Sequence, residues 1–143
     1  MGKRLGELTK ENTKCMVSVN GVRLIDRMLT QLAARELSRV VIVVGYKKEE
    51  LIAHIGNRYD DRIKIEYVHN DIYDKTNYIY SMFLARDYID DDMIFLHGDL
   101  VFDRKLVRDM LDCEWPDCAT VNFSKPLPEK DFKGRVKDGR VLE

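Results

Sequence analysis

The chain has 143 residues, with 24 basic and 25 acidic side chains and a formal net charge of −1. This balance argues against nucleic-acid and membrane-surface partners, because both attract a basic excess. No apolar run reaches the roughly 20 residues that span a bilayer, and the first residues carry no signal-peptide core. Cys15, Cys113 and Cys118 follow no disulfide or metal-ligand spacing. Isolated thiols fit a reducing compartment, so we expect a cytoplasmic protein.

Helical and strand-like apolar patterns alternate along the chain, which has the length of one domain. We therefore expect a single domain over residues 1–143. In chain order the patterns predict a short apolar run at 15–19 closed by an Asn20-Gly21 turn, a helix at 22–36, a strand at 39–45, a helix at 48–55, a strand at 63–68, a helix at 77–88, a strand at 92–96, a helix at 103–111, a strand at 118–123 and a terminal hairpin at 132–142.

The run at 39–45 is continuously apolar and β-branched, which is typical of a strand buried on both faces of a parallel sheet. Alternating strands and helices then indicate an α/β three-layer sandwich with a mainly parallel sheet and right-handed crossovers. In open sheets of this kind, ligands bind beyond the carboxyl ends of the strands. Candidate functional residues should therefore follow strands.

Two segments meet that condition. Asp99 follows the predicted strand at 92–96 and could bind Mg²⁺, which commonly takes one or two carboxylates plus phosphate oxygens; a helix cap or a solvated loop is the alternative role. The loop after residue 68 carries Asn70, Thr76 and Asn77, whose amide and hydroxyl groups can donate and accept hydrogen bonds with a polar ligand. Turn and helix-cap chemistry is the alternative for these residues.

The opening of the chain resembles a known signature. Gly2-Lys3-Arg4-Leu5, Leu8-Thr9, Lys14-Cys15-Met16 and Val19 to Ile25 follow the order of LAAGxGxRL…LTxxxPKxL…VxGxPLI in sugar-phosphate nucleotidyltransferases. The leading strand and first glycine of that signature are missing, and Thr13 stands where proline is usual. The segment Asn70 to Ser81 resembles N-x-x-Y-x-x-T-N-N-x-x-S of the phosphocholine cytidylyltransferase-like branch, with Tyr78 in place of the second paired asparagine.

The resemblance implies a nucleotide-diphospho-sugar transferase-like fold that lacks its first strand and is truncated at both ends. It implies that Gly2 brings the backbone close to the phosphates, that Arg4 and Lys14 are catalytic cations on them, and that Asp99 holds Mg²⁺. It further implies nucleotide binding by Asn70, Thr76 and Asn77, and acceptor binding by Tyr73 and Tyr78. Aromatic faces suit an acceptor that carries a quaternary ammonium group.

The function implied is Mg²⁺-dependent cytidylyl transfer from CTP to phosphocholine or a similar phosphate ester, with release of pyrophosphate. Its partners would be a nucleoside triphosphate and a small phosphorylated acceptor. Two alternatives stay open: a sugar-1-phosphate nucleotidyltransferase, and a non-catalytic domain that folds and self-associates. A homodimer is the form that the second alternative favours, because exposed sheet edges pair readily.

Overall fold

The computed structural model describes residues 12–35, 37–122, 124 and 134–142. The chain divides into two compact units, Met1–Asp112 and Cys113–Glu143. Whether both belong to one domain stays a prediction.

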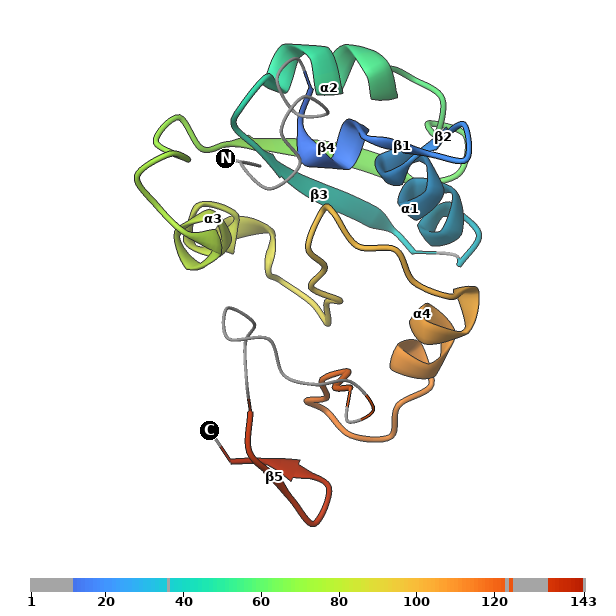
Figure 1. Cartoon of the computed structure of the whole chain (residues 1–143), viewed down its shortest axis with the longest axis vertical. Coiled ribbons are helices and arrows are strands. Elements are labelled where there is room, and N and C mark those ends of the chain that lie inside the picture. The colour runs from blue at the N-terminus through green and yellow to red at the C-terminus, as the bar shows by residue number, and fades with distance from the viewer. Residues whose placement is uncertain (1–11, 36, 123, 125–133, 143) are drawn as a thin grey trace. The chain divides into compact units, whose positions relative to one another are not determined.

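The first unit alternates helices and strands, as the sequence pattern predicts (Figure 1). The predicted helix at 48–55 is confirmed with the same bounds, and the helices at 22–36, 77–88 and 103–111 are confirmed with shorter bounds. The strands at 39–45 and 63–68 are confirmed to within one residue at each end. The elements are a 3₁₀ turn η2 (Lys14–Met16), β1 (Ser18–Val19), β2 (Val22–Arg23), α1 (Leu24–Ala33), β3 (Arg39–Val44), α2 (Lys48–Ile55), β4 (Lys64–His69), α3 (Tyr78–Leu84), a 3₁₀ turn η3 (Arg86–Tyr88) and α4 (Arg104–Leu111).

The two long strands, β3 and β4, pair in parallel. Their register runs from Arg39 opposite Lys64 to Val44 opposite His69. The backbone N–H of Asn70 then donates to the carbonyl of Val44 at 2.8 Å, which extends the pairing by one step. Both strands therefore end at the same edge, where the chain leaves β4 and leads into α3 (Figure 1). The predicted parallel arrangement is confirmed for this pair.

A tight hairpin joins β1 to β2. Asn20 and Gly21 form its turn with φ of 52° and 77°, and Val19 pairs with Val22. Two consecutive positive φ values match the hairpin turn that Asn-Gly favours. The predicted Asn20-Gly21 turn is confirmed.

Two predicted strands are wrong in the described residues. Residues 92–96 and 118–122 take no part in any strand pairing there, and Phe123 lies outside the described residues. In the first segment Ile94 and Leu96 pack against buried residues, whereas Phe95 is 45% exposed. The alternation of burial is that of a strand, but a strand also needs a hydrogen-bonded neighbour, which an apolar pattern cannot specify.

The sheets of the described residues are small: each has two strands, and the pairs β1–β2 and β5–β6 are antiparallel. An α/β organisation holds, but the three-layer sandwich is not confirmed and stays a prediction. In the second unit, β5 (Val136–Lys137) and β6 (Arg140–Val141) form the predicted hairpin around Asp138-Gly139. The first two positions of that prediction, 132 and 133, fall outside the described residues.

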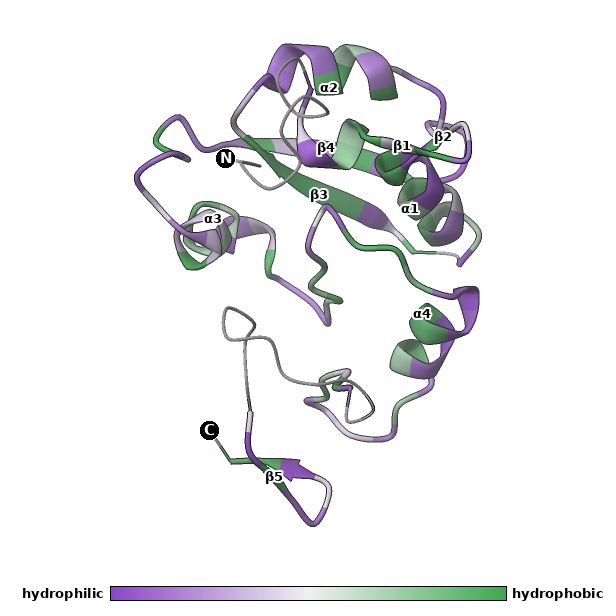
Figure 2. Cartoon of the chain, in the orientation of Figure 1, coloured by the Kyte–Doolittle hydropathy of each residue, from purple (hydrophilic) through white to green (hydrophobic). Residues whose placement is uncertain are grey.

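Helix α1 contributes to two hydrophobic clusters. Ile25 and Leu29 pack in one cluster with residues of β3 and α2, and Met28 and Leu32 pack in the other with Val107 of α4. Figure 2 shows β3 as almost wholly apolar, while α2 and α4 each carry apolar and polar residues. Burying a leucine side chain such as Leu29, which is 1% exposed, contributes about 1.5–3 kcal/mol. These clusters hold β3, and with it the strand edge, in place.

Candidate functional site

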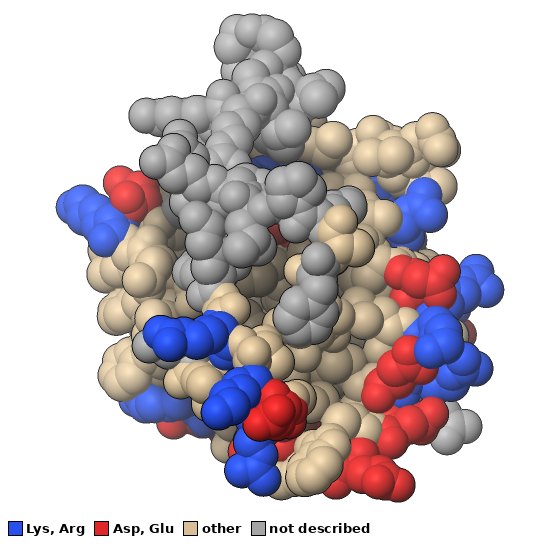
Figure 3. Space-filling model, turned by 60° about the horizontal axis from the view of Figure 1, so that its bottom comes forward, with Lys and Arg blue, Asp and Glu red and all other residues tan. Residues whose placement is uncertain are grey.

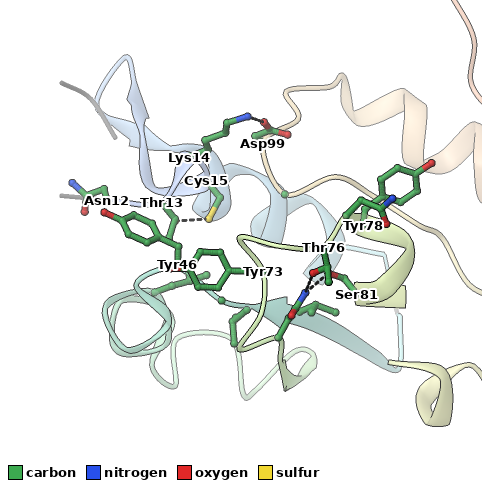
Figure 4. A pocket seen from close by; sticks show the side chains of 17 residues that line it. Asn12, Thr13, Lys14, Cys15, Tyr46, Tyr73, Thr76, Tyr78, Ser81 and Asp99 are labelled. Carbon is green, nitrogen blue, oxygen red and sulfur yellow. Dashed lines mark hydrogen bonds and ion pairs between the residues drawn. The ribbon is translucent and has the colours of Figure 1, made fainter. Parts of the chain in front are cut away.

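A cavity of about 410 Å³ lies at the edge where β3 and β4 end (Figure 4). Its size falls in the range of roughly 300–1,000 Å³ that is common for small-molecule sites. Most of the residues that the sequence nominates line this one cavity: Lys14, Asn70, Tyr73, Thr76, Asn77, Tyr78 and Asp99. The other two nominated residues, Gly2 and Arg4, fall outside the described residues.

Lys14 and Asp99 form an ion pair across the cavity. The Nζ atom of Lys14 lies 3.3 Å from Oδ2 of Asp99, and both side chains are about half exposed. Lys14 is presented by the 3₁₀ turn, which closes when Met16 N–H donates to the carbonyl of Thr13 at 3.0 Å. An exposed pair of this kind contributes only about 0–1 kcal/mol. Both charges can therefore exchange partners when a charged ligand enters.

The donors around Asp99 decide which kind of metal site is possible. Within the described residues, no three His, Cys, Asp or Glu side chains come together as a metal site. Mg²⁺ in nucleotide sites commonly takes one or two carboxylates and completes its shell with phosphate oxygens and water. A single carboxylate thus fits Mg²⁺ that arrives on a polyphosphate, and does not fit an ion held by protein ligands alone.

Asn70 is buried beneath the loop that follows β4. Its side chain, in a residue only 3% exposed, donates from Nδ2 to Thr76 Oγ1 at 3.1 Å and to Ser81 Oγ at 3.2 Å. Its Oδ1 accepts from the backbone N–H of Ile72 at 3.1 Å. Figure 4 shows Thr76 and Ser81, the two side chains that accept from this amide, close to each other. The amide therefore joins the loop to α3.

Asn77 has the cap role that was the alternative to base recognition. Its Oδ1 accepts from the backbone N–H of Ile79 at 3.0 Å and so begins α3. An N-cap asparagine satisfies a backbone donor that has no partner inside the helix. Since Asn77 also lines the cavity, the cap places its amide group at the cavity wall.

The two nominated tyrosines have different surroundings. Tyr73 packs directly on Gly45: a Cβ atom added at Gly45 would lie 2.8 Å from its Cβ, Cγ and Cδ1 atoms. The Tyr46 ring lies 6.1 Å away, centroid to centroid. Tyr78 instead contacts His97, with ring centroids 5.4 Å apart, and its ring points away from Tyr73 in Figure 4. The two rings therefore do not form one aromatic cage.

Several cavity residues had not been nominated: Thr13, Cys15, Gly45, Tyr46, Ser81 and Gly98. Gly45 and Tyr46 directly follow β3, so the rule that ligands bind beyond strand ends could have found them. Cys15 had no such signal. Its Sγ lies 2.9 Å from Thr13 Oγ1, and burial raises the pKa of its thiol despite that hydrogen bond.

An ion pair also ties the start of α2 to the loop after β4. Lys48 Nζ donates to Asp71 Oδ1 at 2.8 Å. This hydrogen bond lowers the pKa of Asp71 and raises that of Lys48.

On the face seen in Figure 3, basic and acidic side chains are interspersed, and no surface of one sign forms there. No helix in the described residues has both the length and the apolar character to cross a bilayer.

Comparison with known proteins identifies relatives. Residues 10–130 match the model of the family described as a domain of unknown function, DUF6564. The chain is 33% identical over 127 residues to a CMP-5'-(3-aminopropyl)phosphonate synthase of Streptomyces rubellomurinus. It is 27% identical over 159 aligned positions to a CTP:phosphoglutamine cytidylyltransferase of Campylobacter jejuni, and 32% identical over 105 residues to the UTP–glucose-1-phosphate uridylyltransferase AglF of Haloferax volcanii.

The alignments cover 89%, 99% and 73% of this chain but only 20%, 60% and 42% of these three relatives. Further relatives are named as choline-phosphate and 2-aminoethylphosphonate cytidylyltransferases. No solved structure gives a significant match. The family model covers most of the chain, and the relatives share one reaction type. The chain therefore belongs to the DUF6564 family, and its homologues are nucleotidyltransferases.

Proposed function

We propose that the chain carries the site for cytidylyl transfer from CTP to a small phosphate or phosphonate acceptor, with release of pyrophosphate. The observation that carries this proposal is the meeting of Lys14, Asp99 and the loop at 70–77 around one cavity. The names of the relatives support it, because four of them form or transfer cytidylyl groups. Phosphocholine is the acceptor that the sequence motif favours.

The chemistry needs charge to be neutralised on a triphosphate and on the departing pyrophosphate. A fixed cation aimed at phosphate oxygens stabilises that charge, and Lys14 has this role here. Asp99 would hold Mg²⁺, which would supply further charge neutralisation on the phosphates. As CTP enters, its phosphates replace the carboxylate at Lys14 and so release Asp99. Arg4 and Gly2 retain their predicted roles at the phosphates.

The remaining cavity residues orient the two substrates. Residues of the loop at 70–77 line the same cavity, and the loop binds the nucleotide base through Thr76 and Asn77. Tyr73 and Tyr78 border the acceptor, and a ring face attracts an acceptor that carries an ammonium group. Catalysis then comes from positioning and charge stabilisation, without a covalent enzyme intermediate.

The test is pyrophosphate release from CTP or from UTP, each with Mg²⁺ and a panel of acceptors: phosphocholine, 2-aminoethylphosphonate and glucose-1-phosphate. Lys14→Ala and Asp99→Asn should each lower kcat/KM by about 10²–10³-fold, as for the loss of one charge-stabilising group. Lys137→Ala and Asp117→Asn are matched controls, since both residues are exposed and lie outside the cavity. They should leave kcat/KM within about twofold of the unsubstituted chain.

The same panel separates the rivals. Preference for UTP and glucose-1-phosphate would assign the chain to sugar-phosphate chemistry, which the match to AglF favours. A thermal shift by CTP and Mg²⁺ without turnover would indicate a non-catalytic nucleotide-binding domain. The absence of both turnover and a thermal shift would contradict the proposed function of this chain.

A further inference from the structure

Asn70 has little hydrogen-bonding capacity left for a ligand. A neutral amide offers two N–H donors and one carbonyl acceptor with two lone pairs. Both donors are engaged, by Thr76 Oγ1 at 3.1 Å and by Ser81 Oγ at 3.2 Å. The carbonyl already accepts from Ile72 N–H at 3.1 Å. With the residue only 3% exposed, the remaining lone pair does not face solvent freely.

The orientation of this amide follows from its partners. Ile72 contributes a backbone N–H, which can only donate, so the group facing it is the carbonyl oxygen. The Thr76 hydroxyl donates its hydrogen to the carbonyl of Ile72 at 2.9 Å, so Thr76 Oγ1 must accept from Asn70. Both constraints place Nδ2 toward Thr76 and Ser81. The network is directional, and a flipped amide would break it.

The network connects three parts of the site: the end of β3, the loop after β4, and α3. The backbone of Asn70 bonds to Val44 at the end of β3, and its side chain holds Ile72 and Thr76 in the loop and Ser81 in α3. The loop it spans carries Tyr73, Thr76 and Asn77, all of which line the cavity. Buried polar groups that are fully bonded rigidify their surroundings, because the alternative is an unpaired polar atom.

We propose that Asn70 is a positioning residue, which holds the 70–81 segment against the ends of β3 and β4 and does not itself read the nucleotide base. This inference rests on the proposed function for its substrate, CTP. It replaces the sequence-based expectation that Asn70 contacts the base. Ser81 belongs to the same hydrogen-bond network, because it contributes one of the two acceptors for the Asn70 amide.

Nucleotide selectivity distinguishes positioning from base recognition. CTP and UTP differ at the pyrimidine edge, so a residue that reads the base changes the ratio of their affinities when it is replaced. Isothermal titration of CTP and UTP should therefore be run on Asn70→Asp, Asn70→Ala and Ser81→Ala. Asn57→Asp is the matched control, because Asn57 is exposed and does not line the cavity.

The expected result is a loss of affinity for CTP of about tenfold in the Asn70 variants, from the loss of about one or two hydrogen bonds, with any change in the CTP-to-UTP ratio shared by Ser81→Ala. Asn70→Asp retains the shape but sets an acceptor against Thr76 Oγ1, whose hydrogen is committed to Ile72. Ser81→Ala should cause a smaller loss, and Asn70→Ala with Ser81→Ala should be no weaker than Asn70→Ala alone. Asn57→Asp should bind as the unsubstituted chain does.

A changed CTP-to-UTP ratio in the Asn70 variants, with an unchanged ratio in Ser81→Ala, would overturn the inference in favour of base reading. Unchanged affinity in all variants would also overturn it. Amide hydrogen exchange provides a readout without nucleotide: Ile72 N–H should exchange about tenfold faster in Asn70→Ala than in Asn57→Asp. If the unsubstituted chain binds no nucleotide, the proposed function fails. The exchange experiment still tests the positioning role in that case, because equal exchange rates at Ile72 in Asn70→Ala and Asn57→Asp would overturn it.

Discussion

Cys15 lines the cavity next to Lys14, so its thiol reports on the site. Burial raises the pKa of this thiol above its ordinary value of 9.0, and the negative charge of Asp99 adds to the effect. The hydrogen bond with Thr13 opposes the shift without cancelling it. A thiol reacts with alkylating reagents as its thiolate, so a raised pKa lowers its reactivity near neutral pH.

We predict that alkylation of Cys15 by iodoacetamide rises with pH along a curve displaced to higher pH than that of the chain unfolded in urea. Peptide mass spectrometry, with the rate measured at each pH, gives both curves. Saturating CTP should slow the modification further by covering the cavity. A Cys15 that reacts in the folded chain as fast as in the unfolded chain at every pH would contradict the prediction.

The raised pKa of Cys15 also determines whether the stability of the folded chain rises or falls at alkaline pH. Because the pKa of Cys15 is higher in the folded chain, its contribution is fully present below the ordinary value of 9.0 and is lost as the pH rises through the folded pKa. Urea unfolding should therefore show less alkaline loss of stability in Cys15→Ser than in the unsubstituted chain.

At the scale of single residues, the sequence predicts well where side chains follow strands. Thr76 lines the cavity because β3 and β4 end at one edge, which hydrophobic patterns reveal. Asp99 lines it too, although residues 92–96 join no strand in the described part of the chain. The role of Asn70 could not be predicted, since it depends on Ser81 being brought within 3.2 Å by the start of α3. Residue type indicates what an amide can do, whereas its role depends on which partners surround it.

Among the elements, the loop after β4 packs closely against the end of β3. Tyr73 lies where a Cβ on Gly45 would come within 2.8 Å of it. The atoms concerned include Cβ and Cγ of Tyr73, so the side chain cannot relieve the clash by rotating its ring alone. A residue larger than glycine must move the loop backbone.

Gly45→Ala should therefore destabilise the chain by about 1–3 kcal/mol, the usual range for overpacking, and should weaken CTP binding as well. Urea unfolding at constant m-value measures the first effect, and titration measures the second. Gly98→Ala is the control for the stability measurement, because its Cβ would meet only Cys15, at an ordinary 4.0 Å. Equal stability of the two variants would contradict this account of the contact.

The elements also show what periodicity can predict. Helices α1 and α4 could be predicted because each closes its own hydrogen bonds, so one apolar face defines it. The segment at 92–96 has an apolar pattern that predicts a strand just as clearly, yet it pairs with no strand in the described residues. A strand depends on a neighbour from elsewhere in the chain, and no local pattern contains that information.

For the whole molecule, the division into two units indicates which part of the chain contains the cavity and the hydrophobic clusters. Every described residue that lines the cavity lies between Asn12 and Asp99. The two hydrophobic clusters use described residues from Met16 to Val107. Both sets lie inside the first unit, Met1–Asp112. Nucleotide binding should therefore need only that unit.

We predict that residues 1–112 alone bind CTP with an affinity within about twofold of that of the full chain. Titration calorimetry of the two forms measures this, with urea unfolding to verify that the shorter form folds. Residues 1–98 provide the comparison, because that form loses Asp99 together with Val107, a buried member of the second cluster. It should lose both a cooperative transition and CTP binding. A folded 1–112 form that binds CTP more than about tenfold more weakly would instead assign part of the nucleotide site to residues 113–143.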